Sequence, residues 1–314
     1  ELTMDEIFPR IKNLTNPFST TAEFKKILSS MKNTSAPGIS TQPKILFEFL
    51  IDLLPSFVTN ALNNLYTIDN IDESPFKFIK DRNVVFIPKK NCDLSLAESF
   101  RAIALLEVVY KLISKALNKK LTFHLENIIH SEQFGYVPER TMATCSLNIT
   151  ATLNHAVQHN QICQAISFDF SKAFDKVLAE VINAIIVHIF PSGNFSKSFI
   201  NLTTNGRFRA AIKGHFSKFF KIKVGSSQGD APSGSKFIIL NHIFICCLLS
   251  KRLKHSFYKI GRITIAPKSY ADDTFAIFQL KSNREIHELI ILLKELKNSI
   301  GLEINFKKSK ILVH

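Results

Sequence analysis

The chain has 314 residues, of which 46% are hydrophobic and 21% charged, so its composition indicates globular domains and excludes a disordered chain. This length is sufficient for two or three modest domains with a sizeable core. The formal net charge of +14 indicates a polyanionic partner, either nucleic acid or an acidic membrane surface.

The cysteine pattern and the apolar runs indicate an intracellular protein, in the cytoplasm or the nucleus, that is not secreted. The five cysteines lack the C-x-x-C spacing of zinc or redox sites, so we expect reduced thiols. The longest apolar run, Phe237 to Leu249, is too short to span a bilayer, and no contact with a membrane is predicted. Because the chain begins with Glu1 and not Met, we expect it to be part of a longer polyprotein.

The first half of the chain shows mainly helical patterns. Residues 1–35 carry no clear site, and a helix broken at Pro55 is predicted from Ile45 to Leu65. Val84–Ile87 reads as a short strand that ends before Lys89 and Lys90. Residues 102–129 have a helical pattern, and a loop with Gly135 and Pro138 is expected at 133–140.

The second half predicts alternating strands and helices. The expected elements are a strand at Ala165–Phe170, a helix at 171–189, a hairpin of Arg207–Lys213 with Phe216–Val224, a helix at 233–255, β-type runs at Ile263–Ala266 and Thr274–Phe278, a helix at 284–299, and a last strand at Ile311–Val313. This order favours the α+β class, with helices packed on one face of an antiparallel sheet.

Three carboxylates are candidates for one site. Asp169 ends an apolar strand, and Asp272 and Asp273 stand between two β-type runs where a turn is expected. Brought together, they would repel one another unless cations joined them, and oxygen ligands favour Mg²⁺ or Mn²⁺ over zinc. The alternatives are an ordinary turn for Asp272 and Asp273 and a helix N-cap for Asp169.

Six segments resemble, in the family's order, the reverse transcriptases of non-LTR (LINE-type) retrotransposons. The palm motifs are Ile166–Val177, Val224–Ser233, Tyr270–Asp273 and Gly301–Leu312, and the fingers motifs are Ser99–Leu106 and Ser131–Arg140. The resemblance implies a right-hand polymerase of fingers and palm, whose palm is an antiparallel sheet backed by helices and whose thumb is absent or truncated. It divides the chain into an N-terminal extension (1–35), fingers (36–160) and palm (161–314), with a hairpin at 206–224 on the border between fingers and palm.

The resemblance also implies roles for individual residues. Asp169, Asp272 and Asp273 would be catalytic and hold two Mg²⁺ ions, or Mn²⁺, with the main chain of Phe170 as a further ligand. The dNTP would be bound by Lys89, Lys90, Arg101, Phe174, Gln228, Gly229, Lys307 and Lys308. Phe174 would exclude a ribose 2′-hydroxyl, although a core Phe on an amphipathic helix fits the same pattern. The lysines fit solvated surface positions equally well.

The implied activity is RNA-directed DNA polymerisation, with an RNA template, a DNA primer and dNTPs as partners. Basic clusters at 111–120, 251–254 and 307–310 suit a duplex backbone. Two other functions remain open at this point: an RNA-dependent RNA polymerase, and a catalytically inactive RNA-binding transposon remnant.

Overall fold

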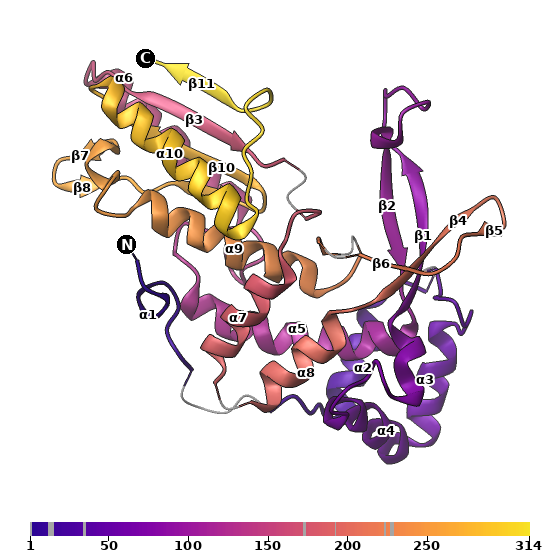
Figure 1. The fold of residues 1–314 in the computed structure, drawn as a ribbon. Coiled ribbons are helices and arrows are strands. Elements are labelled where there is room, and N and C mark those ends of the chain that lie inside the picture. The colour runs from indigo at the N-terminus through magenta and orange to yellow at the C-terminus, as the bar shows by residue number, and fades with distance from the viewer. Residues whose placement is uncertain are drawn as a thin grey trace. The chain divides into compact units, whose positions relative to one another are not determined.

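The chain folds into two compact units, each described here by itself. The computed structural model describes residues 2–11, 16–33, 36–171, 174–191, 193–222, 224–226 and 229–314 (Figure 1). The first unit comprises Glu1–Pro9, Thr122–Ile182 and Gly234–His314, and the second comprises Arg10–Leu121 and Asn183–Ser233. Each unit has its own sheet and its own covering helices.

The first unit is built on a four-stranded antiparallel sheet with the order β11-β3-β10-β9. Its strands are β3 (Gln164–Asp169), β9 (Lys268–Tyr270), β10 (Asp273–Phe278) and β11 (Lys310–Val313), with a separate small hairpin of β7 (Lys259–Ile260) and β8 (Ile263–Thr264). Its helices are α1 (Met4–Ile7), α6 (Met142–Gln158), the 3-10 turn η3 (Lys254–Ser256), α10 (Asn283–Ile300) and most of α9 (Pro232–Leu248).

Both faces of the central strand β3 are packed by apolar side chains. Phe168 meets Phe244 of α9 edge to face, with ring centroids 5.5 Å apart. On the opposite face, Ala165 belongs to a buried cluster with Ala156 of α6 and Ile277 of β10. Successive residues of a strand point to opposite faces, and this alternation buries both sides of β3 up to its last residue, Asp169.

The sequence explains why helix α10 forms after the β9–β10 hairpin. Ser282 caps α10 through a capping box with Glu285, in which each side chain accepts from the other residue's main-chain N–H. Leu289, Leu293 and Leu296 are buried at helical spacing and form one apolar face. Helix α10 connects β10 to the segment that leads to β11.

The second unit combines a five-stranded sheet with several helices. The sheet has the order β2-β1-β4-β5, with β6 also paired to β4, and only β1 and β4 run parallel. Its strands are β1 (Asp81–Pro88), β2 (Phe100–Leu105), β4 (Arg207–Ile212), β5 (His215–Phe216) and β6 (Phe220–Lys221). Its helical elements are α2 (Thr21–Ser30), α3 (Lys44–Leu53), α4 (Pro55–Thr67), η1 (Pro75–Lys80), η2 (Ala97–Ser99), most of α5 (Val108–Ile128) and of α7 (Ala179–Ile189), and α8 (Asn194–Thr203).

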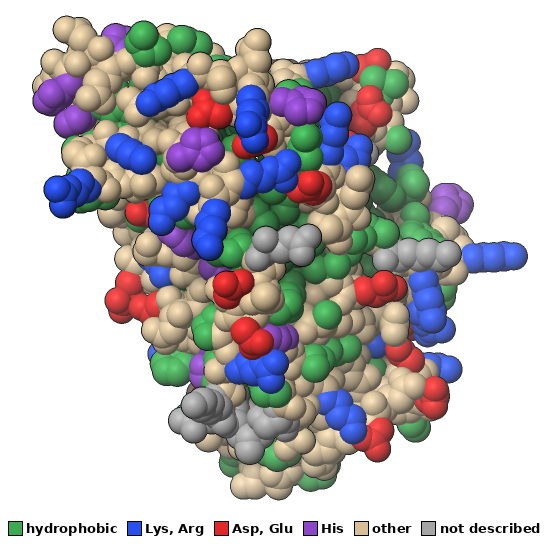
Figure 2. Space-filling view, turned by 60° about the vertical axis from the view of Figure 1, so that its left-hand side comes forward, with side chains coloured by type: hydrophobic (Ala, Val, Ile, Leu, Met, Phe, Trp, Pro, Cys, Tyr) green, Lys and Arg blue, Asp and Glu red, His purple; other side chains and the backbone are tan. Residues whose placement is uncertain are grey.

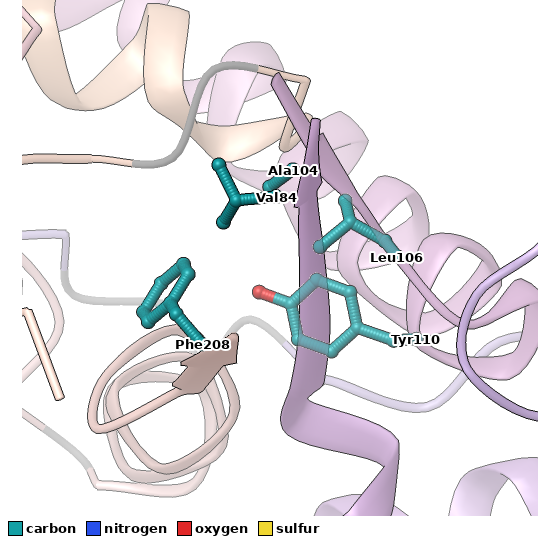
Figure 3. Packing of buried hydrophobic residues seen from close by; sticks show 5 residues of the cluster. All are labelled: Val84, Ala104, Leu106, Tyr110 and Phe208. Atoms are coloured by element: carbon teal, nitrogen blue, oxygen red, sulfur yellow. The ribbon is translucent and has the colours of Figure 1, made fainter. Parts of the chain in front are cut away.

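A buried cluster joins the sheet of the second unit to α5. Its members are Val84, Ala104, Leu106, Tyr110 and Phe208, all 7% exposed or less, and Figure 3 shows the hydroxyl end of Tyr110 directed toward the side where Phe208 lies. That hydroxyl accepts from Nη2 of Arg82 (2.8 Å) and donates to Oδ2 of Asp230 (2.7 Å). The cluster therefore encloses a charged pair that is bridged by a neutral hydroxyl.

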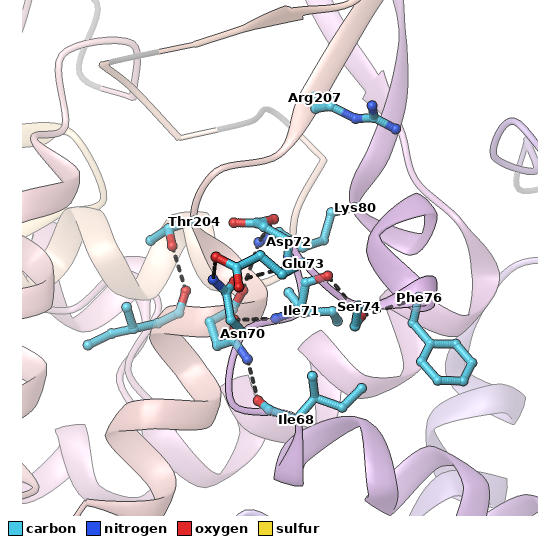
Figure 4. A network of polar contacts seen from close by, with 12 residues as sticks. Ile68, Asn70, Ile71, Asp72, Glu73, Ser74, Phe76, Lys80, Thr204 and Arg207 are labelled. Atoms are coloured by element: carbon cyan, nitrogen blue, oxygen red, sulfur yellow. Dashed lines mark hydrogen bonds and ion pairs between the residues drawn. The ribbon is translucent and has the colours of Figure 1, made fainter.

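The connection from α4 to β1 is held by its own polar contacts (Figure 4). Asn70 Nδ2 donates to Glu73 Oε1 (2.7 Å), and the N–H of Asp72 donates to Asn70 Oδ1 (3.1 Å). Lys80, which is 1% exposed, pairs with Asp72 at 2.7 Å. Desolvation lowers the pKa of Lys80, and the Asp72 partner partly offsets this effect.

Most predicted elements are present, but five boundaries were wrong. The hairpin arm predicted at Phe216–Val224 is two short strands, His215–Phe216 and Phe220–Lys221. Residues 102–105 belong to strand β2, because they pair with β1. The helix predicted at 171–189 begins only at Ala179, and the helix predicted at 233–255 ends at Leu248. The strand before the Asp pair is Lys268–Tyr270 and not Ile263–Ala266, whose first residues pair with β7. For the strands, pairing with residues distant in the sequence overrides the local pattern.

Helices α1, α2, α6 and α8 were not predicted. Within the described part of the chain, no helix is both long and apolar enough to cross a membrane.

Candidate active site

The β9–β10 hairpin places two carboxylates at its tip. Tyr270 pairs with Asp273, so Ala271 and Asp272 form a two-residue loop. Ala271 has a φ of 54° and Asp272 is not among the residues with positive φ, which is the pattern of a type II′ hairpin turn. The predicted turn is therefore present, and Asp272 and Asp273 are both exposed at it.

Asp169 lies directly opposite Asp273 across the sheet, since the two residues are register partners between β3 and β10. Such partners have Cα atoms about 4.5–5.5 Å apart and side chains on the same face. Burial raises the pKa of Asp273, and the charges of Asp272 and Asp169 raise it further. Residues more than a hundred positions apart in the chain thus form one acidic site.

The donor set of this site suits a divalent cation. It offers carboxylate oxygens only, which Mg²⁺ and Mn²⁺ prefer, and a cation would relieve the repulsion that raises the pKa of Asp273. Among the described residues, no three His, Cys, Asp or Glu side chains already converge on one point. Shared binding by all three carboxylates therefore requires rotation of the exposed Asp272 and Asp273 side chains.

The main chain of Asp169 is held by the segment that joins α10 to β11. Its carbonyl accepts from the N–H of Asn305 (2.7 Å), and its N–H donates to Oγ of Ser309 (3.0 Å). Ser309 Oγ in turn donates to the Asn305 carbonyl (2.9 Å). Lys307 and Lys308 are exposed in the turn between these two residues, which brings them next to the acidic site.

Two phenylalanines that follow β3 pack on α9. The ring of Phe170 is buried against Phe237 and Phe244, with centroid distances of 5.8 and 5.3 Å, and its main chain bridges to Ile304. Phe174 is half-buried against Phe237 at 5.3 Å and stands in a turn, so its placement on a helix was wrong.

The three basic residues expected to bind triphosphate share one hairpin of the second unit. Arg101 of β2 pairs with Ile87 of β1 and is exposed. Lys90 is also exposed, whereas Lys89 donates from Nζ to the Glu98 carbonyl (2.6 Å). Lys89 is therefore engaged within its own loop, and Arg101 and Lys90 are the freer cations of the hairpin.

The loop before α9 carries the other predicted nucleotide-binding residues. Gly229 has a φ of 102°, and a Cβ there would lie 3.3 Å from the carbonyl oxygen of Ala104 in β2. Both the left-handed conformation and the close approach favour glycine. Gln228 lies outside the described residues.

Several residues that support the site were not singled out from the sequence. Asn305 and Ser309 lie within the segment Gly301–Leu312, in which the resemblance implies roles for the lysines alone. Gln133 and Asn241 are 0% exposed polar residues behind the hairpin. The sequence does contain a signal for Asn241, which is a polar residue inside the apolar run Phe237–Leu249. A buried amide in such a run needs a hydrogen-bond partner.

An antiparallel sheet covered by helices, with carboxylates at the ends of two adjacent strands, defines an α+β protein with an acidic, metal-compatible centre. The family model described as "Reverse transcriptase (RNA-dependent DNA polymerase)" matches residues 87–314. The chain belongs to the reverse transcriptase family.

The chain is also similar to a transposon protein. The chain is 26% identical over 264 residues to the Xenopus laevis "Transposon TX1 uncharacterized 149 kDa protein", covering 83% of this chain and 19% of that protein. The chain thus spans about a fifth of the length of this relative.

Two telomerase structures are among the solved structures that share the fold. Both are telomerases from Candida tropicalis with a TM-score of 0.55. The apo form truncated from its C-terminal domain is 13% identical and matches 93% of this chain and 68% of its own. The form in complex with a fragment of telomeric RNA is 14% identical and matches 83% of this chain and 45% of its own.

Proposed function

We propose that the chain catalyses RNA-directed DNA polymerisation. The 3′-hydroxyl of a DNA primer attacks the α-phosphate of a dNTP paired to an RNA template, a new phosphodiester bond forms, and pyrophosphate leaves. The observation that carries this proposal is the register of Asp273 opposite Asp169, with Asp272 in the adjoining turn. Membership of the reverse transcriptase family supports it.

Asp169, Asp272 and Asp273 are the proposed ligands of two Mg²⁺ ions, for which Mn²⁺ can substitute, with the Phe170 carbonyl as a further oxygen. The bound ions would supply activation of the hydroxyl and neutralisation of charge on the leaving phosphate. The carboxylates themselves hold the site's negative charge at the ends of β3 and β10, and the Asn305 and Ser309 bonds fix the main chain of Asp169.

The residues that the family resemblance implies are the proposed contacts of the dNTP. Lys89, Lys90 and Arg101 suit the triphosphate, since Arg forms a planar fork and Lys a compact charge. Gln228 and Gly229 would pack on the base pair, and Lys307 or Lys308 would donate a proton to the departing pyrophosphate. Phe174 would select deoxyribose, which favours DNA over RNA synthesis.

The wider setting is also a proposal. The resemblance to the TX1 protein supports a role within a longer, transposon-encoded polyprotein that acts inside the cell, in the cytoplasm or the nucleus. We propose that residues 36–160 form the fingers and residues 161–314 the palm, with residues 1–35 as an N-terminal extension and the 206–224 hairpin at the border.

Primer extension on an RNA template tests the proposed function. Asp272→Asn should abolish extension without unfolding the protein, whereas Asp52→Asn should retain it. Asp52 is the matched control because it is exposed on α3 and pairs with the surface residue Lys25 at 2.6 Å. Incorporation of rNTPs by the unaltered chain would identify an RNA polymerase. RNA binding without extension under Mg²⁺ or Mn²⁺ would identify an inactive remnant.

A further inference from the structure

A buried polar network lies behind the β9–β10 hairpin. Gln133, Asn241, Ser269 and Thr274 are all 1% exposed or less. Asn241 Nδ2 donates to Gln133 Oε1 (2.5 Å), Ser269 Oγ and Thr274 Oγ1 share a hydrogen bond of 2.6 Å, and Thr274 Oγ1 donates to Asn241 Oδ1 (3.5 Å). The network thus links α9, the loop before α6 and both strands of the hairpin.

The main chain of residues 132–134 runs along β9 as an added parallel edge. The N–H of Ser269 donates to the Glu132 carbonyl (2.9 Å), and the N–H of Phe134 donates to the Ser269 carbonyl (2.7 Å). The side chains of Lys268 and Glu132 also pair at 2.6 Å. The strand that leads into the Asp272 turn is therefore bonded on both edges, since its other edge pairs with β10.

The same segment touches the turn itself. A Cβ built on Gly135 would lie 2.1 Å from the main-chain nitrogen of Ala271, so only glycine permits this approach. The segment is fastened in turn by Arg140, whose Nη1 donates to the carbonyls of His130 (2.7 Å) and Gln133 (2.8 Å). Residues 132–135 and the side chain of Asn241 thus lie directly behind the turn.

We infer that this support, comprising residues 132–135 and the side chains of Asn241, Ser269 and Thr274, positions Asp272 and Asp273 for metal binding. None of these residues touches substrate; they act through the hairpin, as positioning residues. Ser269 and Thr274 are cross-strand partners one residue inside Tyr270 and Asp273, so a shift of their bond moves the carboxylates directly. Groups that orient metal ligands are typically worth about 10–100-fold in metal affinity. The inference rests on the proposed function.

Substitutions at Thr274 test the inference with little change of shape. Thr274→Val removes the hydroxyl but keeps the branched side chain, and Thr274→Ser keeps the hydroxyl. We expect Thr274→Val to weaken Mn²⁺ binding, measured by water proton relaxation, by about tenfold. Amide exchange of the 268–274 hairpin, measured without metal, should accelerate. Thr274→Ser should restore both values.

A second variant separates positioning from folding. Gln133→Met with Asn241→Leu replaces both partners of a buried hydrogen bond by apolar groups of similar size, which is often nearly neutral for stability. The Gly135 carbonyl also loses its donor, Nε2 of Gln133 (3.2 Å), so we expect the double variant to fold but to melt at a somewhat lower temperature. Well below that temperature it should show faster hairpin exchange and weaker Mn²⁺ binding. Tyr258→Phe is the control, because it removes a hydroxyl bonded to His155 (2.9 Å) at the far end of β10.

The outcomes distinguish this inference from the proposed function. Unchanged hairpin exchange and unchanged Mn²⁺ affinity in Thr274→Val would overturn the inference, even if the unaltered chain extends primers normally. The same result in a folded double variant would do so as well. Failure of the unaltered chain to extend any primer would instead overturn the proposed function, and the exchange measurement would still report on the support.

Discussion

The main-chain N–H of Asp169 donates to the hydroxyl of Ser309, 3.0 Å away and 140 positions later in the chain. Loss of this hydroxyl leaves the amide of a half-buried strand end without its partner. We expect Ser309→Ala to destabilise the protein by about 1 kcal/mol and to slow primer extension by about tenfold. Ser309→Thr should keep the bond and the activity. Urea unfolding and extension rates measure the two effects, and an unchanged Ser309→Ala variant would contradict the expectation.

Removal of one charge at the acidic site should stabilise the fold while it destroys activity. The pKa of Asp273 is raised by burial, Asp272 and Asp169, so this carboxyl favours folding below its ordinary pKa and loses that contribution as the pH rises through its folded-state value. Asp273→Asn should therefore raise the melting temperature at pH 7 by about 1–2 °C, a small change because the side chain is exposed.

At about pH 3.5, where the carboxyl is largely protonated in both states, the difference should shrink. Melting curves at the two pH values, with Asp52→Asn as the control, test this. A lower melting temperature for Asp273→Asn at pH 7 would contradict it.

Sugar selection should depend on Phe174. Its ring packs on Phe237 at 5.3 Å, which fixes its position in the turn after β3. Phe174→Ala should raise rNTP incorporation relative to dNTP by about tenfold or more, since a contact worth about 1.4 kcal/mol is tenfold in rate. Phe174→Tyr keeps the bulk and should keep the discrimination. The measurement is kcat/KM for incorporation of a single dNTP and of a single rNTP. Equal ratios of these two values in the unaltered chain, Phe174→Ala and Phe174→Tyr would exclude Phe174 as the residue that selects the sugar.

The hydroxyl of Tyr110 should stabilise the second unit. Burial raises the pKa of Tyr110, so the hydroxyl stays protonated and bridges Arg82 and Asp230. Tyr110→Phe leaves both charges buried without the bridge, which should cost about 1–3 kcal/mol in the free energy of unfolding. Tyr136→Phe is the control, because that side chain is 53% exposed. Denaturant unfolding measures the difference, and equal stability of the two variants would speak against the bridge.

Binding to a primer–template should weaken steeply with salt. Figure 2 shows many Lys and Arg side chains, in blue, on the face of the first unit that the view presents, with Asp and Glu side chains among them. With about six phosphate contacts, affinity should fall roughly 1,000-fold between 50 and 200 mM salt. Lys307→Gln with Lys308→Gln should reduce the slope by up to about two. Fluorescence anisotropy at several salt concentrations gives the slope of log affinity against log salt concentration. An unchanged slope in the double variant would show that neither lysine contacts the phosphates.

The strands and helices nearest the site could be predicted because their patterns are strong. Ile166, Phe168 and Phe170 alternate with polar residues, and β3 spans Gln164–Asp169 as a result. The motif order also pointed to the three carboxylates, of which Asp169 and Asp273 lie opposite each other and Asp272 lies in the adjoining turn. A turn was predicted at Asp272 and Asp273 because aspartate is a common turn residue.

The remaining parts depend on contacts between distant residues. The strand before Asp272 is Lys268–Tyr270, and it is specified by its bonds to residues 132–134 as well as by its own pattern. Residues 174–178 look helical, yet Val177 is buried and Lys176 pairs with Glu303, which holds the segment in turns. A local sequence pattern does not reveal partners that are distant in the chain. The contacts that support the site therefore could not be predicted from the sequence.

The placement of β11 on β3 has a consequence for synthesis on the ribosome. β3 receives one of its two neighbours only when residues 310–313 have been made, and the bond from Ser309 to Asp169 arrives in the same stretch. A nascent chain that stops before residue 301 carries all three aspartates but exposes an unpaired strand edge beside one of them, a surface prone to association. A chain truncated before residue 301 should therefore lack an ordered acidic centre, because β3 loses one strand neighbour and Asp169 loses its bond to Ser309.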